Sequence, residues 1–234
     1  MEEIRKIRKV SIFIFIVPIV ALNLCLFISI NYDLLENTIF VVDQIGRSGF
    51  SIPYIDGSLS ISRSARTYPA YLVFKPSMIL TAILLIMYWR SNNILFKKIN
   101  NIENKKNNSF FIFGVGSAIF LILHSILLGI DLDINIYKFA RRFILLGFII
   151  FEIVAQTLFV LNIMKVKSKI SDLINNKILK LKIILVSILV VVAFIAAPIL
   201  NSSEYVHFKH ALEWNYFLGV VTFYLLTFMF WKKG

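Results

Sequence analysis

Histidine and glutamate side chains near the end of the chain are the residues best suited to chemistry. His207, His210 and Glu213 follow one another at intervals of three, so on a helix they project from neighbouring positions. His124 lies in a separate apolar stretch, near its end. Imidazole and carboxyl groups can act as general acids and bases or hold Zn²⁺. One hypothesis is therefore an intramembrane lipid-remodelling enzyme that uses His124, His210 and Glu213 for acyl transfer or metal-dependent hydrolysis.

Three further polar residues interrupt apolar stretches. Asn23 lies in the first stretch, and Glu152 lies in the fourth with Gln156 one helical turn later. Ionisable side chains are costly inside a membrane, which makes each one a candidate functional residue. The structural alternative is that Glu152 hydrogen-bonds to Gln156 or to a neighbouring helix and serves only packing.

Six apolar stretches carry these residues and decide the fold class. The chain is 59% hydrophobic with a mean hydropathy of +0.81. About 20 apolar residues in a helix cross the roughly 30 Å of a bilayer's hydrocarbon core. We therefore predict an all-α membrane protein: one integral membrane domain over 1–234, built as a six-transmembrane-helix bundle. The predicted helices cover residues 10–30, 72–89, 110–130, 143–164, 181–200 and 211–231.

Charge separates the two faces of the predicted bundle. The N-terminal tail, the second and fourth loops and the C-terminus together carry 17 Lys and Arg residues, whereas the other three loops carry 8. Positively charged loops stay on the cytoplasmic side, so both termini are predicted to be cytoplasmic. The net charge of +12 then reflects topology and attraction to anionic lipid, and no nucleic-acid partner is expected. The membrane and the oligomeric state are left open.

The long outer loop between helices 1 and 2, residues 31–71, is expected to be structured. Arg63 and Arg66 lie there, and a guanidinium matches a phosphate with two hydrogen bonds. With Tyr68 and with Trp214 at the head of helix six, they form the predicted lipid-binding set. Alternatively, the arginines pair with acidic residues of the same loop and fold it. Those acids are Asp33, Glu36, Asp43 and Asp56.

Two segments admit more than one secondary structure. Serines alternate with other residues from Ser58 to Ser64, which suits a short strand or a helix with a serine cap equally. Residues 165–180 suit either an amphipathic helix on the inner membrane surface or an extension of the preceding helix.

Two short motifs carry a resemblance to a known family. The first is Pro53-Tyr54-Ile55-Asp56-Gly57, followed by Pro69, Phe74 and Tyr88-Trp89-Arg90, and the second is His210-Ala211-Leu212-Glu213-Trp214. Together they resemble the DRAM/Sfk/FRAG family of six-helix membrane proteins. That resemblance implies cytosolic termini and roles around membrane lipid, including remodelling of glycolipid-anchor acyl chains and autophagy.

Binding is the function that the sequence favours over catalysis. We expect a multi-pass protein that binds or senses a lipid or lipid-linked molecule in its outer half and acts as a non-catalytic regulator. Its partners would be membrane lipids, and we expect no cofactor and no bound metal. The outer loop would fold over the entrance of helix six, which would place Arg63 and Arg66 beside His210, Glu213 and Trp214.

Overall fold

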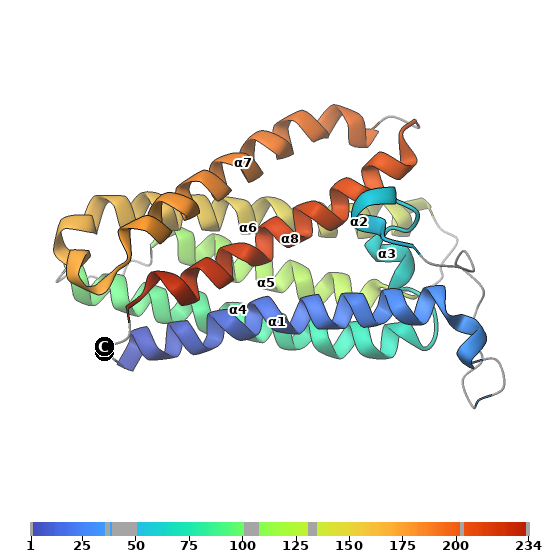
Figure 1. The fold of residues 1–234 in the computed structure, drawn as a ribbon, viewed down its shortest axis with the longest axis horizontal. Coiled ribbons are helices and arrows are strands. Elements are labelled where there is room, and N and C mark those ends of the chain that lie inside the picture. Colours follow the sequence, from blue (N-terminus) through green and yellow to red (C-terminus); the bar gives the residue numbers. More distant parts are fainter. Residues whose placement is uncertain are drawn as a thin grey trace.

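The computed structural model describes residues 2–35, 38, 51–100, 108–130, 135–201 and 204–232. Within these ranges the regular structure is helical, apart from one isolated antiparallel bridge between Ile174 and Trp231. The long helices run side by side along the longest axis of the molecule (Figure 1). They are α1 Glu2–Ile30, α4 Ala70–Asn100, α5 Ser109–Leu127, α6 Asn135–Ile170, α7 Asn176–Asn201 and α8 Val206–Phe230. The short ones are η1 Tyr32–Leu35, α2 Pro53–Asp56, α3 Ile61–Ser64 and η2 Ser171–Leu173.

The prediction of six membrane-spanning helices is confirmed. All six long helices are long and apolar enough to cross a membrane, which makes the chain a multi-pass helical membrane protein. Most of them extend beyond the predicted ranges, because backbone hydrogen bonding continues into polar residues whereas hydropathy marks only the apolar part. Thus α1 begins at Glu2 rather than near residue 10, and α6 runs on to Ile170.

Both ambiguous segments are helical in the structure. Ser60 caps α3, because its hydroxyl oxygen accepts a hydrogen bond of 3.2 Å from the backbone N–H of Arg63. The strand alternative for this segment is therefore wrong. Residues 165–170 extend α6, and the chain turns through η2 before α7 begins at Asn176.

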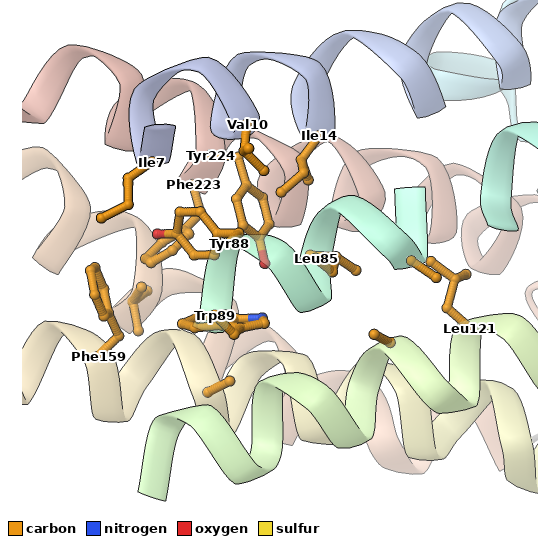
Figure 2. Packing of buried hydrophobic residues seen from close by; sticks show 14 of the residues in the cluster. Ile7, Val10, Ile14, Leu85, Tyr88, Trp89, Leu121, Phe159, Phe223 and Tyr224 are labelled. Carbon is orange, nitrogen blue, oxygen red and sulfur yellow. The ribbon is translucent and has the colours of Figure 1, made fainter. Parts of the chain in front are cut away.

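Aromatic packing forms the centre of the bundle. Tyr88 and Trp89 of α4 meet Phe159 of α6 and Tyr224 of α8, as Figure 2 shows. The ring centroids of Tyr88 and Tyr224 are 5.0 Å apart, and those of Trp89 and Phe159 are 5.9 Å apart. A Cβ atom at Gly114 of α5 would lie 2.4 Å from the Trp89 indole, so glycine is what lets α5 approach α4.

Each long helix packs on particular neighbours, and different segments form the two ends of the bundle (Figure 1). In the sequence of contacts, α1 packs on α4, α4 on α5 and α5 on α6, and α8 lies against α1 and α7. The start of α1 and the end of α8 share one end of the bundle, and α2 and α3 lie at the other end (Figure 1). We refer to residues 51–69, which contain α2 and α3, as the docked segment.

Candidate functional site

The docked segment begins with a turn that its own sequence specifies. Pro53 starts α2, where a missing N–H costs nothing, and Gly57 ends it with a φ of 58°, which glycine adopts without strain. The Asp56 carboxylate accepts hydrogen bonds from the backbone N–H groups of Ile52 (2.9 Å) and Ser58 (2.8 Å). Slight burial opposes ionisation of Asp56, but these hydrogen bonds outweigh it and lower the pKa of that carboxyl.

Hydrogen bonds to backbone carbonyls hold this turn against the first turns of α8. The Nδ1 atoms of His210 and His207 lie 2.9 Å and 3.3 Å from the carbonyl oxygen of Gly57. Asn215 donates to the carbonyl oxygen of Tyr54 at 2.7 Å. A Cβ atom at Gly57 would lie 1.7 Å from the carbonyl oxygen of His207, so the two backbones touch directly. This is the contact predicted between the outer loop and the entrance of helix six.

Trp214 anchors the docked segment from inside the protein. Its indole is fully buried, and its N–H donates a hydrogen bond of 2.8 Å to the carbonyl oxygen of Leu59. The Tyr54 ring packs on it with a centroid distance of 4.8 Å. Trp214, one of the predicted lipid-binding residues, therefore offers no exposed face to a lipid in this structure and serves to hold the segment in place.

Glu213 caps α3 from a different helix. Its carboxylate accepts hydrogen bonds from the backbone N–H groups of Ile61 and Ser62, the first two residues of α3. N–H groups in the first turn of a helix have no partner within the helix, so an acceptor from elsewhere satisfies them. With Ser60 bonded to the N–H of Arg63, every N–H group of this turn has a partner. The geometry assigns Glu213 to positioning the segment.

Helix α1 contacts the docked segment through side chains as well. Asn23, one of the predicted intramembrane polar residues, exchanges hydrogen bonds of 3.1 and 3.2 Å with the hydroxyl of Tyr54. Ser29 donates to the carbonyl oxygen of Ser64 at 2.7 Å. Burial raises the pKa of the Tyr54 phenol, although the hydrogen bond with Asn23 acts in the opposite direction. The segment is thus fixed on two sides, by α1 and by α8.

The predicted cationic residues lie on the surface of this assembly. Arg63 is exposed, and its charge is close enough to act on His210. Arg66 is partly buried and donates a hydrogen bond of 3.3 Å to the hydroxyl of Ser62. Tyr68 is partly buried as well, with its ring centroid 5.8 Å from that of Tyr71.

Of the four acids predicted to pair with the arginines, the structure describes Asp33 and Asp56. The Asp56 carboxylate is taken up by backbone N–H groups and by Ser51. Glu36 and Asp43 lie outside the described residues. Among the described residues, no carboxylate forms an ion pair with Arg63. The Arg63 side chain is exposed.

His124 does not join the other two residues of the predicted catalytic set. It is buried in the last turn of α5, where its ring centroid is 6.4 Å from that of Phe74, and the charge of Arg141 acts on it. No hydrogen bond or ring contact links His124 to His210 or Glu213 in the described part of the chain. That part also holds no cluster of three or more His, Cys, Asp or Glu residues arranged to hold a metal. Asp131 and Asp133, which the sequence places near His124, lie outside it.

Glu152 forms a polar centre in the middle of the bundle. Its Oε1 accepts hydrogen bonds from Gln156 (2.9 Å) and from the hydroxyl of Tyr224, and its Oε2 is 2.6 Å from the hydroxyl of Ser117. Gln156 also donates to the carbonyl oxygen of Val220 at 3.2 Å. The hydrogen bond predicted between Glu152 and Gln156 is present, and the cluster joins α5, α6 and α8.

Lys182 is a buried lysine that the sequence argument missed. The charge count assigns it to the inner loop, but in α7 its side chain is fully buried and Nζ donates to the Thr227 hydroxyl at 2.6 Å. Its Nζ atom lies 3.9 Å from the ring centroid of Phe223 and within 5.3 Å of two further rings, those of Phe159 and Phe230. Helical phase is the signal that could have found it, because Lys182 shares a face with buried residues Leu179 and Val186.

No family model, curated protein or solved structure matches this chain. The resemblance to the DRAM/Sfk/FRAG family therefore stays a prediction.

Proposed function

We propose that this protein binds the anionic headgroup of a membrane lipid, or of a lipid-linked molecule, at the surface formed by the docked segment and the start of α8. Arg63 carries the proposal. Its guanidinium is exposed and has no carboxylate partner among the described residues, while its backbone is fixed by Ser60. A guanidinium presented on a fixed backbone binds a phosphate with two parallel hydrogen bonds and loses little conformational freedom in doing so.

Neighbouring residues support an anion at this surface. Arg66 follows Arg63 one turn later in the segment. The carboxylates of Glu213 and Asp56 are already engaged, because Glu213 bonds to the backbone of α3 and Asp56 to its own turn. The surface therefore combines cations with acidic groups that are already occupied by backbone donors.

A binding role fits this geometry better than catalysis by the predicted residues. Glu213 is engaged by two backbone N–H groups, both nearby histidines point their Nδ1 atoms at one carbonyl oxygen, and His124 makes its contacts elsewhere. The two segments that carry the family resemblance touch each other, through Gly57 and His210 and through Leu59 and Trp214. Their contact supports a shared structural purpose for both motifs.

The orientation that we propose places the docked segment outside and both termini in the cytoplasm. Moving Lys182 from the inner loop into the bundle lowers the count of cations on the inner side by only one, so the charge asymmetry persists. Single cysteines in a Cys25→Ser background would test the orientation in intact cells. A cysteine replacing the exposed Ile55 should react with an impermeant reagent, and one replacing the exposed Lys98 should react only after permeabilisation. Labelling of both from one side would contradict the scheme.

Lipid retention tests the headgroup site. The protein would be purified in mild detergent, and the lipids that remain bound would be counted by mass spectrometry. Arg63→Ala should lower phospholipid retention, and Arg63→Ala with Arg66→Ala should lower it further. Arg90→Ala, which removes an exposed arginine of α4, is the matched control. Equal retention in the double variant and the control would reject the site.

A further inference from the structure

The hydroxyl of Ser117 can give its hydrogen to only one of the two oxygens beside it. The hydroxyl of Ser117 lies 2.6 Å from Oε2 of Glu152 and 2.8 Å from the carbonyl oxygen of Gly114. A serine hydroxyl has only one hydrogen to donate. If that hydrogen goes to Gly114, the hydrogen between Ser117 and Glu152 must belong to the carboxyl group.

The other side of the carboxyl group is consistent with a protonated acid. Oε1 receives hydrogen bonds from the side-chain amide of Gln156 and from the hydroxyl of Tyr224. Oε2 is therefore the oxygen that can carry a hydrogen, with Oε2–H donating to Ser117 and Ser117 donating to Gly114. A neutral carboxylic acid is compatible with all of these contacts.

In the part of the chain that the structure describes, no charged group faces Glu152. Tyr224 of α8 and Tyr88 of α4 are the titratable groups that face it, and Ser117 of α5, Gln156 of α6 and Trp89 of α4 are uncharged. The buried lysine of α7, Lys182, bonds instead to Thr227 and forms no ion pair with Glu152 among the described residues. An unpaired carboxylate at a fully buried position carries a large desolvation cost.

We propose that Glu152 binds an exchangeable proton in the core of the bundle, and that its O–H donates to Ser117 and so ties α6 to α5. The bound proton then stabilises the packing of α6 on α5, because it supplies the O–H that donates to Ser117. Its release leaves the carboxyl group with acceptors only. Ser117 would have to turn away from Gly114 to donate to Oε2, and a negative charge would remain between α5, α6 and α8. The junction of these three helices is therefore sensitive to proton uptake and release. This inference is independent of the proposed lipid site.

Infrared difference spectroscopy of the full-length protein in detergent or lipid bilayers tests the proposal. A protonated carboxyl group shows a C=O stretching band that ionised carboxylates lack and that shifts in D₂O. The measurement is made in a Glu213→Gln background, because the carboxyl group of Glu213 is buried as well and can contribute a band of its own. The band should be present at neutral pH in Glu213→Gln and lost when Glu152→Gln is added, which keeps the shape and donates from its amide in place of O–H.

The proposal would be overturned by a Glu213→Gln spectrum without the band at neutral pH, or by a band that survives when both Glu213→Gln and Glu152→Gln are present. Ser117→Ala provides a second reading that leaves Glu152 intact. Removing the acceptor of the carboxyl O–H should shift the band to higher frequency without abolishing it. An unshifted band in Ser117→Ala would assign the protonated group to another carboxyl and would equally refute the hydrogen-bond arrangement.

Discussion

Trp214 and Leu59 are joined across 155 residues of sequence by a hydrogen bond of 2.8 Å from the indole N–H to the carbonyl oxygen. Both residues are buried, so neither group can turn to water if the other is removed. Two further contacts join the same segments, Gly57 with His210 and Tyr54 with Asn215. The end of the bundle that carries the proposed lipid site is therefore held by side chains of α8 that bind the backbone of the docked segment.

Replacing Trp214 by Phe should destabilise the protein while keeping an aromatic ring against Tyr54. The change leaves the Leu59 carbonyl oxygen buried without a donor, at a cost of about 1–3 kcal/mol. Trp231→Phe is the matched control, because its buried indole N–H has no hydrogen-bond partner among the described residues. Thermal unfolding in detergent should show a larger fall in unfolding temperature for Trp214→Phe than for Trp231→Phe. Equal falls would show that the hydrogen bond to Leu59 does not stabilise the protein.

Replacing Gly57 by Ala should detach the docked segment from α8. The φ of 58° costs a residue with a side chain about 1–2 kcal/mol, and the added Cβ would overlap the carbonyl oxygen of His207. Gly129 is the matched control position. Its φ of 85° would strain the backbone of an alanine, but the added Cβ would lie 3.4 Å from the nearest atom and would not overlap it. Limited proteolysis should therefore cut residues 51–69 faster in Gly57→Ala than in Gly129→Ala. Similar protection in both variants would contradict the close contact of the two backbones.

Replacing Thr227 by Val should destabilise the bundle through Lys182. Thr227 accepts hydrogen bonds from Lys182 (2.6 Å) and from the hydroxyl of Tyr88 (3.2 Å) while donating to the carbonyl oxygen of Phe223. Valine removes the oxygen that accepts from the buried amine, and an unsatisfied buried donor costs about 1–3 kcal/mol.

A double-mutant cycle separates the contribution of Lys182 from that of Tyr88. In a Lys182→Met background the buried amine is absent. Thr227→Val should therefore lower the unfolding temperature clearly less in that background than in the wild type. Lys180→Met, which alters an exposed lysine of the same helix, should leave the effect of Thr227→Val unchanged. Additive losses for Lys182→Met and Thr227→Val would show that the two side chains do not interact.

Acid should loosen the turn around Asp56. Hydrogen bonds hold the pKa of this carboxyl below its ordinary value in the folded protein, so its ionised form contributes stability above that ordinary value. The contribution is lost as the pH falls through the lowered pKa, since protonation removes the acceptor for the N–H groups of Ile52 and Ser58. Proteolysis of residues 51–69 should accelerate at acidic pH in the wild type. Asp56→Asn should start from lower protection and change less, and an equal acid response in both would assign it to other groups.

The sequence by itself determined the class of the protein and some local geometry. Apolar length requires helices that satisfy their own backbone hydrogen bonds in a membrane, so the six spans could be read without any partner information. Pro53, Asp56 and Gly57 likewise specify a turn through their own backbone preferences and side-chain acceptors. The Glu152–Gln156 bond followed from their spacing of one helical turn.

Only the tertiary structure decided what the remaining polar residues do. The sequence suggested an acid–base role for Glu213 and a lipid contact for Trp214. In the structure, Glu213 accepts hydrogen bonds from the backbone of α3, and Trp214 donates one to Leu59. His124 and His210 were candidates for one site, yet they contact different elements. The charge count placed Lys182 in a loop, and the packing of α7 on α8 buried it. Spacing along the chain fixes which residues share a face of one helix, whereas the rotation and contacts of neighbouring helices, set by packing across the whole bundle, fix which faces meet.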